Sequence, residues 1–374
     1  MLKTVCLRKK ATNSRIKKVI YKIVASNMKQ TINLAQIGVG YWGRNLLRSF
    51  YHSEYIGTLI AVDPSEKAQQ WVKKEYPTIK IRDGFESVLK DSSVQAIVLA
   101  TPANTHFALA KQALLAGKHL FVEKPLALSV KEAEELVALA RLNRRILMVG
   151  HTFLYNAAVR TIKSYIEEGL LGQIYYVYSQ RLNLGRVRSD VNALWNLAPH
   201  DLSILLYWFE KLPLQVSAKG DSFLQDSVED VVFLNLDFQG GVSAHVHVSW
   251  LDPNKRRSMT LVGSKKMVVY EDTSADAKIK IYDKGITKKN IDDSLGDYDN
   301  FGKFQLIQRA GDLLIPKINF IEPLRVETNH FLESITTGKP PLTDGGHGLQ
   351  VIRILEAAQK SLKSNNLPVK ISGI

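Results

Sequence analysis

The sequence predicts an α/β protein of two domains: a doubly wound parallel sheet, followed by an α+β domain built on a large, mostly antiparallel sheet. The length of 374 residues exceeds what a single small core needs. Between residues 31 and 150, short apolar runs alternate with helical stretches, as in strand–helix–strand units. After residue 150, apolar runs follow one another across short turns, which favours antiparallel pairing.

The first domain is expected over residues 31–150. Helical stretches separate its strands, and Ser129 with Glu132 forms a capping box that opens a helix ending at Leu142. This alternation predicts that the strands run parallel and that helices lie on both faces of the sheet. The predicted strands are 32–37, 58–62, 94–100, 119–122 and 146–149.

The second domain is expected over residues 151–374. In the polar stretch 272–322 we expect a hairpin and a long loop. Two helices are predicted to end the chain, from Pro323 to Thr336 and from His347 to Ser364, in a position to pack back on the first domain. The predicted strands are 173–181, 228–238, 241–250, 258–263 and 266–271.

The distribution of charge argues against a nucleic-acid partner. The net charge is +14, but residues 1–30 hold nine Lys or Arg and no acidic residue, so the rest of the chain is only mildly basic. We expect residues 1–30 to be a disordered basic tail, with Met28 as the functional start. The only cysteine, Cys6, lies in this tail, which suits a reducing, cytoplasmic compartment. No apolar run approaches the ~20 residues that span a bilayer, so no membrane partner is expected.

A metal site is not predicted. His245 and His247 point to the same side of the predicted strand 241–250, where they could be ligands. No acidic residue or further histidine accompanies them nearby in the sequence, so we interpret them as polar residues on a sheet face.

The first predicted strand ends in a G-x-G-x-x-G pattern that is typical of a dinucleotide site. Gly38 allows the tight turn, Gly40 lets the backbone approach the pyrophosphate, and Gly43 lets the next helix close on the strand. Tyr41 and Trp42 lie at the start of that helix, whose N–H groups attract phosphate. The second strand ends in Asp63, 20 residues past Gly43, where a carboxylate accepts from the adenosine ribose and repels a 2′-phosphate. The pattern favours a Rossmann domain that binds NAD over NADP.

Two further strand ends carry polar residues that we expect beside the cofactor. Thr101 and Pro102 follow the strand 94–100, at the sheet edge where ligands bind. His106 either lies near the cofactor or caps the helix that follows. The strand 119–122 ends in Glu123 and Lys124, followed by a proline that can fix the ammonium toward a cleft. Desolvation there would lower the lysine pKa toward usefulness in acid–base chemistry.

The third polar segment, 195–201, precedes an apolar helix. We expect this helix to start at Pro199, which would place His200 in its first turn. There the helix dipole favours a neutral imidazole, which can accept a proton from a hydroxyl. The alternative is a histidine that only caps the helix.

These segments resemble the Gfo/Idh/MocA oxidoreductase family, from Thr31 to the C-terminus. The resemblance is carried by the glycine pattern, Thr101-Pro102 with His106, Glu123-Lys124-Pro125 and the segment that includes His200. In that family the lysine of E-K-P lies between nicotinamide and substrate, and a D-x-x-x-H pattern supplies a histidine. The resemblance therefore implies catalytic roles for Lys124 and His200.

The sequence departs from the family pattern at Asn196, which stands where the family has Asp. An amide can hold a hydroxyl, but it does not raise the basicity of a neighbour as a carboxylate does. We therefore expect Lys124 and His200 to handle the proton without a carboxylate. The stretches 195–204, 310–312 and 321–325 are most similar to nucleotide-sugar members, such as UDP-N-acetylglucosamine 3-dehydrogenase-like proteins. The resemblance implies NAD-dependent hydride transfer at a hydroxyl or ketone carbon of a sugar, specifically a nucleotide sugar.

A substrate diphosphate would need cationic donors. Arg181, Arg186 and Arg188 flank a polar, glycine-containing stretch just before the His200 segment, and the alternative is a solvated basic loop. The candidate substrate-binding residues are Lys124, Tyr155, Arg181, Arg186, Asn196 and His200.

Two other functions stay open on the sequence alone. One is an NAD-dependent glycosidase or lyase that recycles its cofactor, and the other is a non-catalytic NAD-binding scaffold, against which intact Lys124 and His200 argue. In the family the second-domain sheet commonly packs against another subunit. The resemblance therefore also implies a homodimer or homotetramer.

Overall fold

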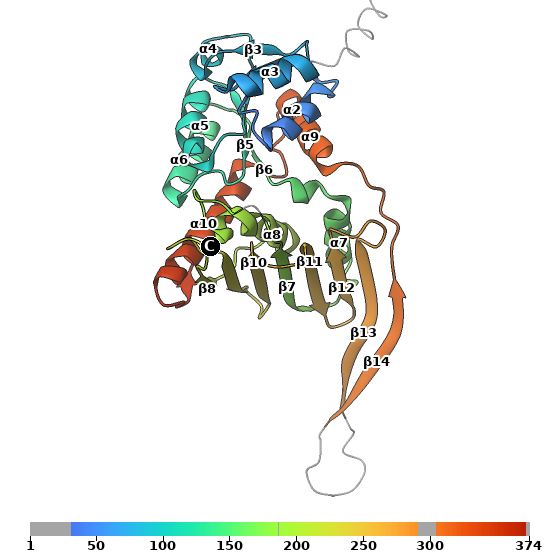
Figure 1. Ribbon diagram of the computed structural model, residues 1–374. Coiled ribbons are helices and arrows are strands. Elements are labelled where there is room, and N and C mark those ends of the chain that lie inside the picture. Colours follow the sequence, from blue (N-terminus) through green and yellow to red (C-terminus); the bar gives the residue numbers. More distant parts are fainter. Residues whose placement is uncertain (1–30, 186, 291–303, 372–374) are drawn as a thin grey trace, which may run out of the picture.

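The computed structural model describes residues 31–185, 187–290 and 304–371. The expectations for the basic tail and for Arg186 lie outside these residues. The described chain forms two sheets, with the smaller sheet and its helices above the larger one in Figure 1. This confirms the predicted fold class, a doubly wound parallel sheet followed by an α+β part with a large sheet.

The first sheet has six parallel strands in the order β3-β2-β1-β4-β5-β6. The chain reverses direction across the sheet between β1 and β4, and this switch point is where doubly wound sheets bind ligands. The strands β1, β4 and β5 are buried because they are almost wholly apolar, as parallel strands covered on both faces must be. They are β1 (Ile32–Ile37), β2 (Ile56–Val62), β3 (Lys80–Arg82), β4 (Ala96–Leu99), β5 (His119–Glu123) and β6 (Leu147–Gly150).

Helices connect these strands, as the alternating pattern predicts. The α6 helix starts where expected, because the Ser129 side chain accepts from the Glu132 N–H at 3.2 Å. The helices are α2 (Gly43–Tyr51), α3 (Glu66–Glu75), α4 (Phe85–Leu89), α5 (His106–Leu115) and α6 (Val130–Leu142), with a 3-10 turn η1 (Ala103–Thr105) before α5.

The second sheet has nine strands in the order β14-β13-β12-β11-β7-β10-β9-β8-β15. Neighbouring strands among the described residues pair antiparallel except for β7 and β10. They are β7 (Ile174–Leu182), β8 (Gln215–Asp221), β9 (Val231–Asp237), β10 (Ser243–Ser249), β11 (Arg256–Gly263), β12 (Met267–Glu271), β13 (Ile279–Asn290), β14 (Phe304–Leu314) and β15 (Val369–Lys370).

Helices cover one face of this sheet, and the other face is open. They are α7 (Ala157–Glu167), α8 (Ala193–Phe209) and α10 (Gly345–Lys363). On the open face, Tyr176, Tyr178 and Phe233 are each more than 40% exposed. Beyond the body of the sheet, β13 and β14 extend as a long hairpin (Figure 1).

The C-terminal helices also contact the first sheet's layer. The α9 helix (Pro323–Thr337) packs on α2, where Ser49 and Thr328 hydroxyls lie 2.7 Å apart. The α10 helix packs on α6, and the Val130 N–H donates to Glu356 at 2.7 Å. These contacts hold the two halves against each other. Within the described residues, no helix combines the length and apolarity needed to cross a bilayer.

Three strands and one helix start differ from the sequence expectations. The strands β3 and β15 have three and two residues, too short for a pattern, and β8 is largely polar. The expectation that a helix begins at Pro199 is wrong. The α8 helix begins at Ala193, because the Asn192 side chain caps it by accepting from the Trp195 N–H at 3.1 Å.

Candidate active site

The glycine loop lies at the switch point of the first sheet, between the ends of β1 and β4. Gly38 has a φ of +91°, and a Cβ there would stand 2.5 Å from the Ala100 carbonyl oxygen. A Cβ on Gly43 would stand 2.4 Å from the Gly38 oxygen. A Cβ on Gly40, by contrast, would meet nothing within 4 Å, so its backbone is open to a ligand. This is a cradle for a pyrophosphate at the start of α2.

Asp63 follows β2 beside this loop. Its carboxylate accepts from the Val39 N–H at 2.7 Å and from the Ser65 N–H at 2.9 Å. Each carboxylate oxygen keeps a further lone pair for a ribose hydroxyl. Thr101 and Pro102 follow β4 across the switch point. The residues present therefore fit NAD: a glycine cradle, a helix N-terminus and a carboxylate at the end of the second strand.

Tyr41 and Trp42 lie in the exposed part of the loop, and Trp42 ties it to the next strand end. The indole N–H of Trp42 donates to Glu123 at 2.6 Å. Tyr41 is 81% exposed. The loop that would hold the cofactor is thus bonded to the residue that precedes Lys124.

His106 lies beside the Thr101 loop and is not the cap residue of α5. It is the first residue of α5 and is buried, and its ring nitrogens lie 2.7 Å from the Pro125 oxygen and 3.0 Å from the Thr101 oxygen. Both nitrogens are therefore engaged by the backbone, so neither is free for a cofactor, and Thr105 is the cap residue. His106 joins the loop after β4 to the loop after β5.

Glu123 ends β5 and Lys124 follows it, at the edge of the first sheet that lies against α8. Burial raises the pKa of Glu123 to about 7, against the Trp42 hydrogen bond and the Lys124 charge, which lower it. Burial lowers the pKa of Lys124 to about 8, against the Glu123 charge, which raises it. Lys124 is thus an amine that titrates near neutral pH, as acid–base chemistry requires.

Lys124 reaches to the second sheet's layer. Its ammonium donates to the Asn196 backbone oxygen at 2.8 Å. The Asn196 side-chain oxygen accepts from the Trp250 indole N–H at 3.2 Å. The structure therefore brings Lys124 and Asn196 together, and His200 follows one helical turn later on α8.

His200 lies in the middle of α8 and not at a helix N-terminus. Its ring packs against Phe153 with centroids 4.9 Å apart. The Arg181 guanidinium lies 4.4 Å from the centroid of the same Phe153 ring. Its Nδ1 is buried and has no hydrogen-bond partner among the described residues. Burial first, then the charges of Lys124 and Arg181, lower the pKa of His200 well below its ordinary value. The predicted neutral imidazole is supported, but its cause is burial and not the helix dipole.

His151 belongs to the same cluster and was missed by the sequence analysis. It directly follows β6, the strand next to β5, and it is 1% exposed. The Lys124 charge acts on both His151 and His200, which places the three groups within one electrostatic neighbourhood. The signal was available: a histidine immediately after a buried strand, at the edge that carries Lys124.

Two residues expected to bind substrate have other partners. The Tyr155 hydroxyl is buried and lies 3.1 Å from His330 Nδ1 and 3.3 Å from the Thr343 hydroxyl, both in the C-terminal part. Arg181 is buried and donates to both carboxylate oxygens of Asp201, at 2.6 and 3.0 Å. These contacts join elements of the fold to one another.

Arg188 lies at the surface with a partner of its own. It forms an ion pair with Asp190, at 2.6 Å. Arg186 lies outside the described residues, so two of the three arginines proposed for a diphosphate are paired with carboxylates. No group of three metal-ligating side chains occurs in the part of the chain that the structure describes.

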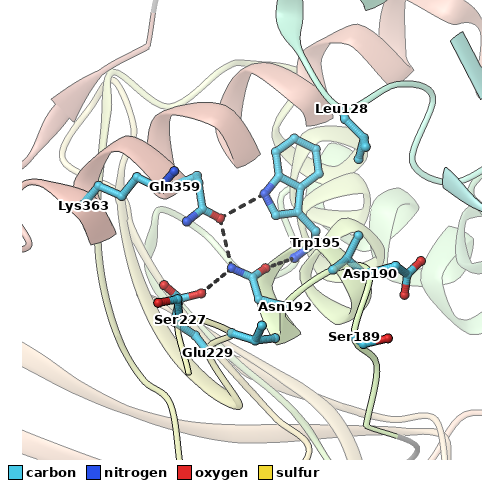
Figure 2. A pocket seen from close by; sticks show the side chains of 11 residues that line it. Leu128, Ser189, Asp190, Asn192, Trp195, Ser227, Glu229, Gln359 and Lys363 are labelled. Atoms are coloured by element: carbon cyan, nitrogen blue, oxygen red, sulfur yellow. Dashed lines mark hydrogen bonds between the residues drawn. The ribbon is translucent and has the colours of Figure 1, made fainter. Parts of the chain in front are cut away.

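A cavity of about 590 Å³ lies beside the N-terminus of α8 (Figure 2). Asn192 donates to Glu229 at 2.6 Å and to Gln359 at 3.0 Å, and the Trp195 indole also donates to Gln359, at 3.1 Å. The lining mixes polar and apolar side chains, and its charged members are Asp190, Glu229 and Lys363. It is suited to hydroxyl groups more than to phosphate.

The fold and the site define a class: a dinucleotide-binding domain whose strand-end lysine faces a histidine from a second, sheet-based domain. Comparison with known families agrees. Residues 32–151 match the NAD-binding Rossmann fold of the Gfo/Idh/MocA oxidoreductase family, and residues 159–269 match the C-terminal domain of the same family. The chain belongs to the Gfo/Idh/MocA family, and NAD is its cofactor.

Three relatives illustrate the range of similarity. An uncharacterized oxidoreductase of Synechocystis is 31% identical over 64% of this chain and 73% of its own. The scyllo-inositol 2-dehydrogenase (NADP⁺) IolW of Bacillus subtilis is 26% identical over 87% of this chain and 94% of its own. The UDP-N-acetylglucosamine 3-dehydrogenase of Acidithiobacillus ferrooxidans is 27% identical over 52% of this chain and 59% of its own.

A solved structure of the UDP-N-acetylglucosamine 3-dehydrogenase of Acidithiobacillus ferrooxidans shares the fold. It superposes with a TM-score of 0.71 at 22% identity, covering 90% of this chain and 99% of that chain. The sequence match to the first curated relatives spans just over half of their length. The likeness therefore establishes family and fold, and the reaction is argued from the site.

Proposed function

We propose that the protein is an NAD-dependent dehydrogenase that acts on a CH–OH group of a sugar or polyol. The observation that carries the proposal is the bond between the Lys124 ammonium and the Asn196 backbone at 2.8 Å, with His200 one turn further along α8. It brings an amine from the end of β5 close to the helix that carries the imidazole, in the domain that holds a cradle fitting NAD. When bound, NAD supplies the nicotinamide ring that accepts or returns a hydride.

In the proposed mechanism, the chain's own residues hold the reacting oxygen and move its proton. A carbinol carbon gives up a hydride readily only while its hydroxyl proton is being removed. His200 is neutral because burial lowers its pKa, so it can accept that proton. Lys124 is proposed to hold the same oxygen with the N–H groups that it does not give to Asn196. The reverse reaction uses the same groups in the opposite sense.

The finer proposal is that the sugar is a nucleotide sugar. It is supported by the named activity of the Acidithiobacillus relative, whereas the Bacillus relative is named for an inositol. Arg181 and Arg188 are paired with carboxylates, so a diphosphate would have to draw on other cations. Free sugars and inositols therefore belong in the same assay as UDP-, dTDP- and GDP-sugars.

The test is a turnover assay of the full chain with NAD and that panel, following NADH absorbance. Sustained NADH formation with one sugar class is expected. Product formation without a net change in NADH would instead assign a recycled cofactor, as in a glycosidase or lyase. If no sugar gave a product, the protein would be interpreted as a non-catalytic NAD-binding scaffold.

Substitution of the two proposed catalytic residues tests the assignment. Lys124→Ala and His200→Ala are each expected to lower kcat by ~10²–10⁴-fold, the usual cost of losing a general acid or base. The double variant should lose less than the product of the single losses, because both groups act on one oxygen. His119→Ala, at the other end of β5, is the matched control and should keep kcat. Near-normal kcat in His200→Ala would remove the histidine from the mechanism.

We also propose a homo-oligomer that buries the open face of the nine-stranded sheet. Tyr176 and Tyr178 on β7 and Phe233 on β9 share that face with His245 and His247 on β10. Phe233 and His247 stack with centroids 4.2 Å apart. These residues form an exposed aromatic strip on an otherwise packed sheet, which suits the same face of a second copy.

A further inference from the structure

His151 stands beside Lys124 at the edge of the first sheet. Strands β5 and β6 run parallel, and Glu123 pairs with Gly150 in their register. The next residues, Lys124 and His151, therefore leave adjacent strands at the same level. Neighbouring strands lie about 4.8 Å apart, so the two backbones leave the edge of the sheet side by side.

The His151 imidazole is buried without a partner. It is 1% exposed, and neither ring nitrogen has a hydrogen-bond partner among the described residues. The ring packs edge-on against His347, with centroids 5.5 Å apart and an angle of 77°, so one side is occupied by another ring. A buried polar group left unpaired destabilises a fold, and in native proteins it calls for a specific explanation.

The charge state of His151 restricts what it can bind. Burial first, then the charges of His347 and Lys124, lower its pKa well below the ordinary value. A neutral imidazole offers one donor and one acceptor, which is the complement of a hydroxyl group. An ionised phosphate or carboxylate only accepts hydrogen bonds, so it could bond to the nitrogen that donates but not to the nitrogen that accepts.

We propose that His151 is a substrate-binding residue that holds a hydroxyl on the carbon next to the reacting carbon. The proposal rests on the proposed function, because in a sugar or polyol that neighbouring carbon carries an oxygen. Lys124 and His200 are assigned to the reacting oxygen, and His151 is adjacent to Lys124 along the sheet edge. The next oxygen along the substrate is then the group that this imidazole can reach.

The role predicts a selectivity that substitution removes. The assay uses the sugar with the highest kcat/KM among UDP-N-acetylglucosamine, D-glucose and scyllo-inositol, and the analogue of it that lacks one hydroxyl beside the reacting carbon. The wild type should prefer the complete sugar by about 10- to 100-fold in kcat/KM, as expected for a buried polar group left unpaired. His151→Phe should narrow this preference to about threefold or less, mainly through KM, and His151→Asn should retain part of it.

Stability and a matched histidine separate this role from a structural one. His119 is half-buried at the opposite end of β5, where its ring accepts from the Ile146 N–H at 3.0 Å. His119→Phe should lower Tm and leave the selectivity unchanged, whereas His151→Phe should keep or raise Tm, because an unpaired polar group is removed.

Three results would overturn the proposal. Wild-type selectivity in His151→Phe would refute it while leaving the dehydrogenase proposal in place. A fall in Tm for His151→Phe with unchanged selectivity would show a structural histidine. Failure of the wild type to turn over any sugar of the full panel would refute the proposed function and this role with it.

Discussion

Lys124 illustrates how placement alone changes the chemistry of a residue. Its ammonium is taken out of water at a strand end, with Glu123 on the same chain and the Asn196 carbonyl opposite. Burial lowers its pKa to about 8, so a small change of pH alters its charge. Burial lowers the pKa of His200 well below its ordinary value, so His200 stays neutral over the same pH range.

The pH profile of sugar oxidation should therefore reveal which group takes the proton. With His200 as the base and charged Lys124 holding the oxygen, kcat/KM should fall as pH rises through about 8, because Lys124 then loses its proton. Lys124→Arg keeps the charge at these pH values and should abolish this alkaline fall. A rise of kcat/KM through about pH 8 would reverse the assignment and make Lys124 the base.

Asp63 should decide the preference between the two nicotinamide cofactors. Its carboxylate is placed to accept from ribose hydroxyls and to repel a 2′-phosphate, while it also holds Val39 of the loop. Asp63→Ala should weaken NAD binding by roughly 10- to 100-fold, the cost of hydrogen bonds to a charged group, and narrow the gap to NADP. Titration of both cofactors by fluorescence measures this, with Asp63→Asn isolating the charge. Tighter NADP than NAD binding by the wild type would contradict the assignment.

At the scale of elements, α8 carries the second half of the site. The Asn192 cap fixes its start, and the two bonds between Arg181 and Asp201 fix its rotation against β7. Asp201 directly follows His200, so this ion pair determines where the imidazole points. Pro199 lies inside the helix and lacks the N–H that would bond to the Trp195 carbonyl.

Asp201→Ala should therefore be strongly destabilising. Removing one partner of a buried ion pair leaves the other charge uncompensated, at a cost of ~3–5 kcal/mol in the free energy of unfolding. The double change Arg181→Met with Asp201→Ala should recover part of this loss. Arg188→Ala, which breaks the exposed pair with Asp190, is the control and should cost under about 1 kcal/mol. Chemical denaturation of the four proteins measures these differences, and equal losses in both single variants would contradict the argument.

At the scale of the whole molecule, the site exists only because two sheets face each other. The α9 and α10 helices return from the C-terminal end of the chain to α2 and α6, and so join the two halves. The Val149 N–H on β6 donates to the Thr343 oxygen at 2.8 Å, next to His151. The far face of the larger sheet is left for association with another copy.

That association gives a prediction on molecular mass. Wild-type protein should sediment as a multiple of the 42.0 kDa chain, because association would bury the exposed aromatic side chains of the strip. Tyr178→Glu places a charge at the centre of the strip and should give the monomer. Phe223→Glu changes an exposed aromatic residue outside the sheet strands and should leave the assembly intact. A monomeric wild-type protein would refute the proposed homo-oligomer.

Much of this arrangement follows from local signals. The glycine pattern, the acidic end of β2 and the buried apolar runs predicted the first sheet, because turn geometry and strand burial act over a few residues. The Lys124 ammonium does bond to Asn196, one helical turn before His200. The predicted helix start at Pro199 is wrong, because Asn192 caps the helix seven residues earlier. Glu229 and Gln359, far away in the sequence, hold the Asn192 side chain in place.

By itself the sequence determined the fold class, the cofactor loop and the residues that end each strand, since these depend on period and spacing. Only the tertiary structure decided which of those residues meet. It engaged His106 with two backbone carbonyls, paired Arg181 with Asp201, and buried Tyr155 against the C-terminal helices. It also set His151 beside Lys124. Which side chains contact one another depends on strand register and on burial between segments that lie far apart in the chain. No local sequence pattern carries that information.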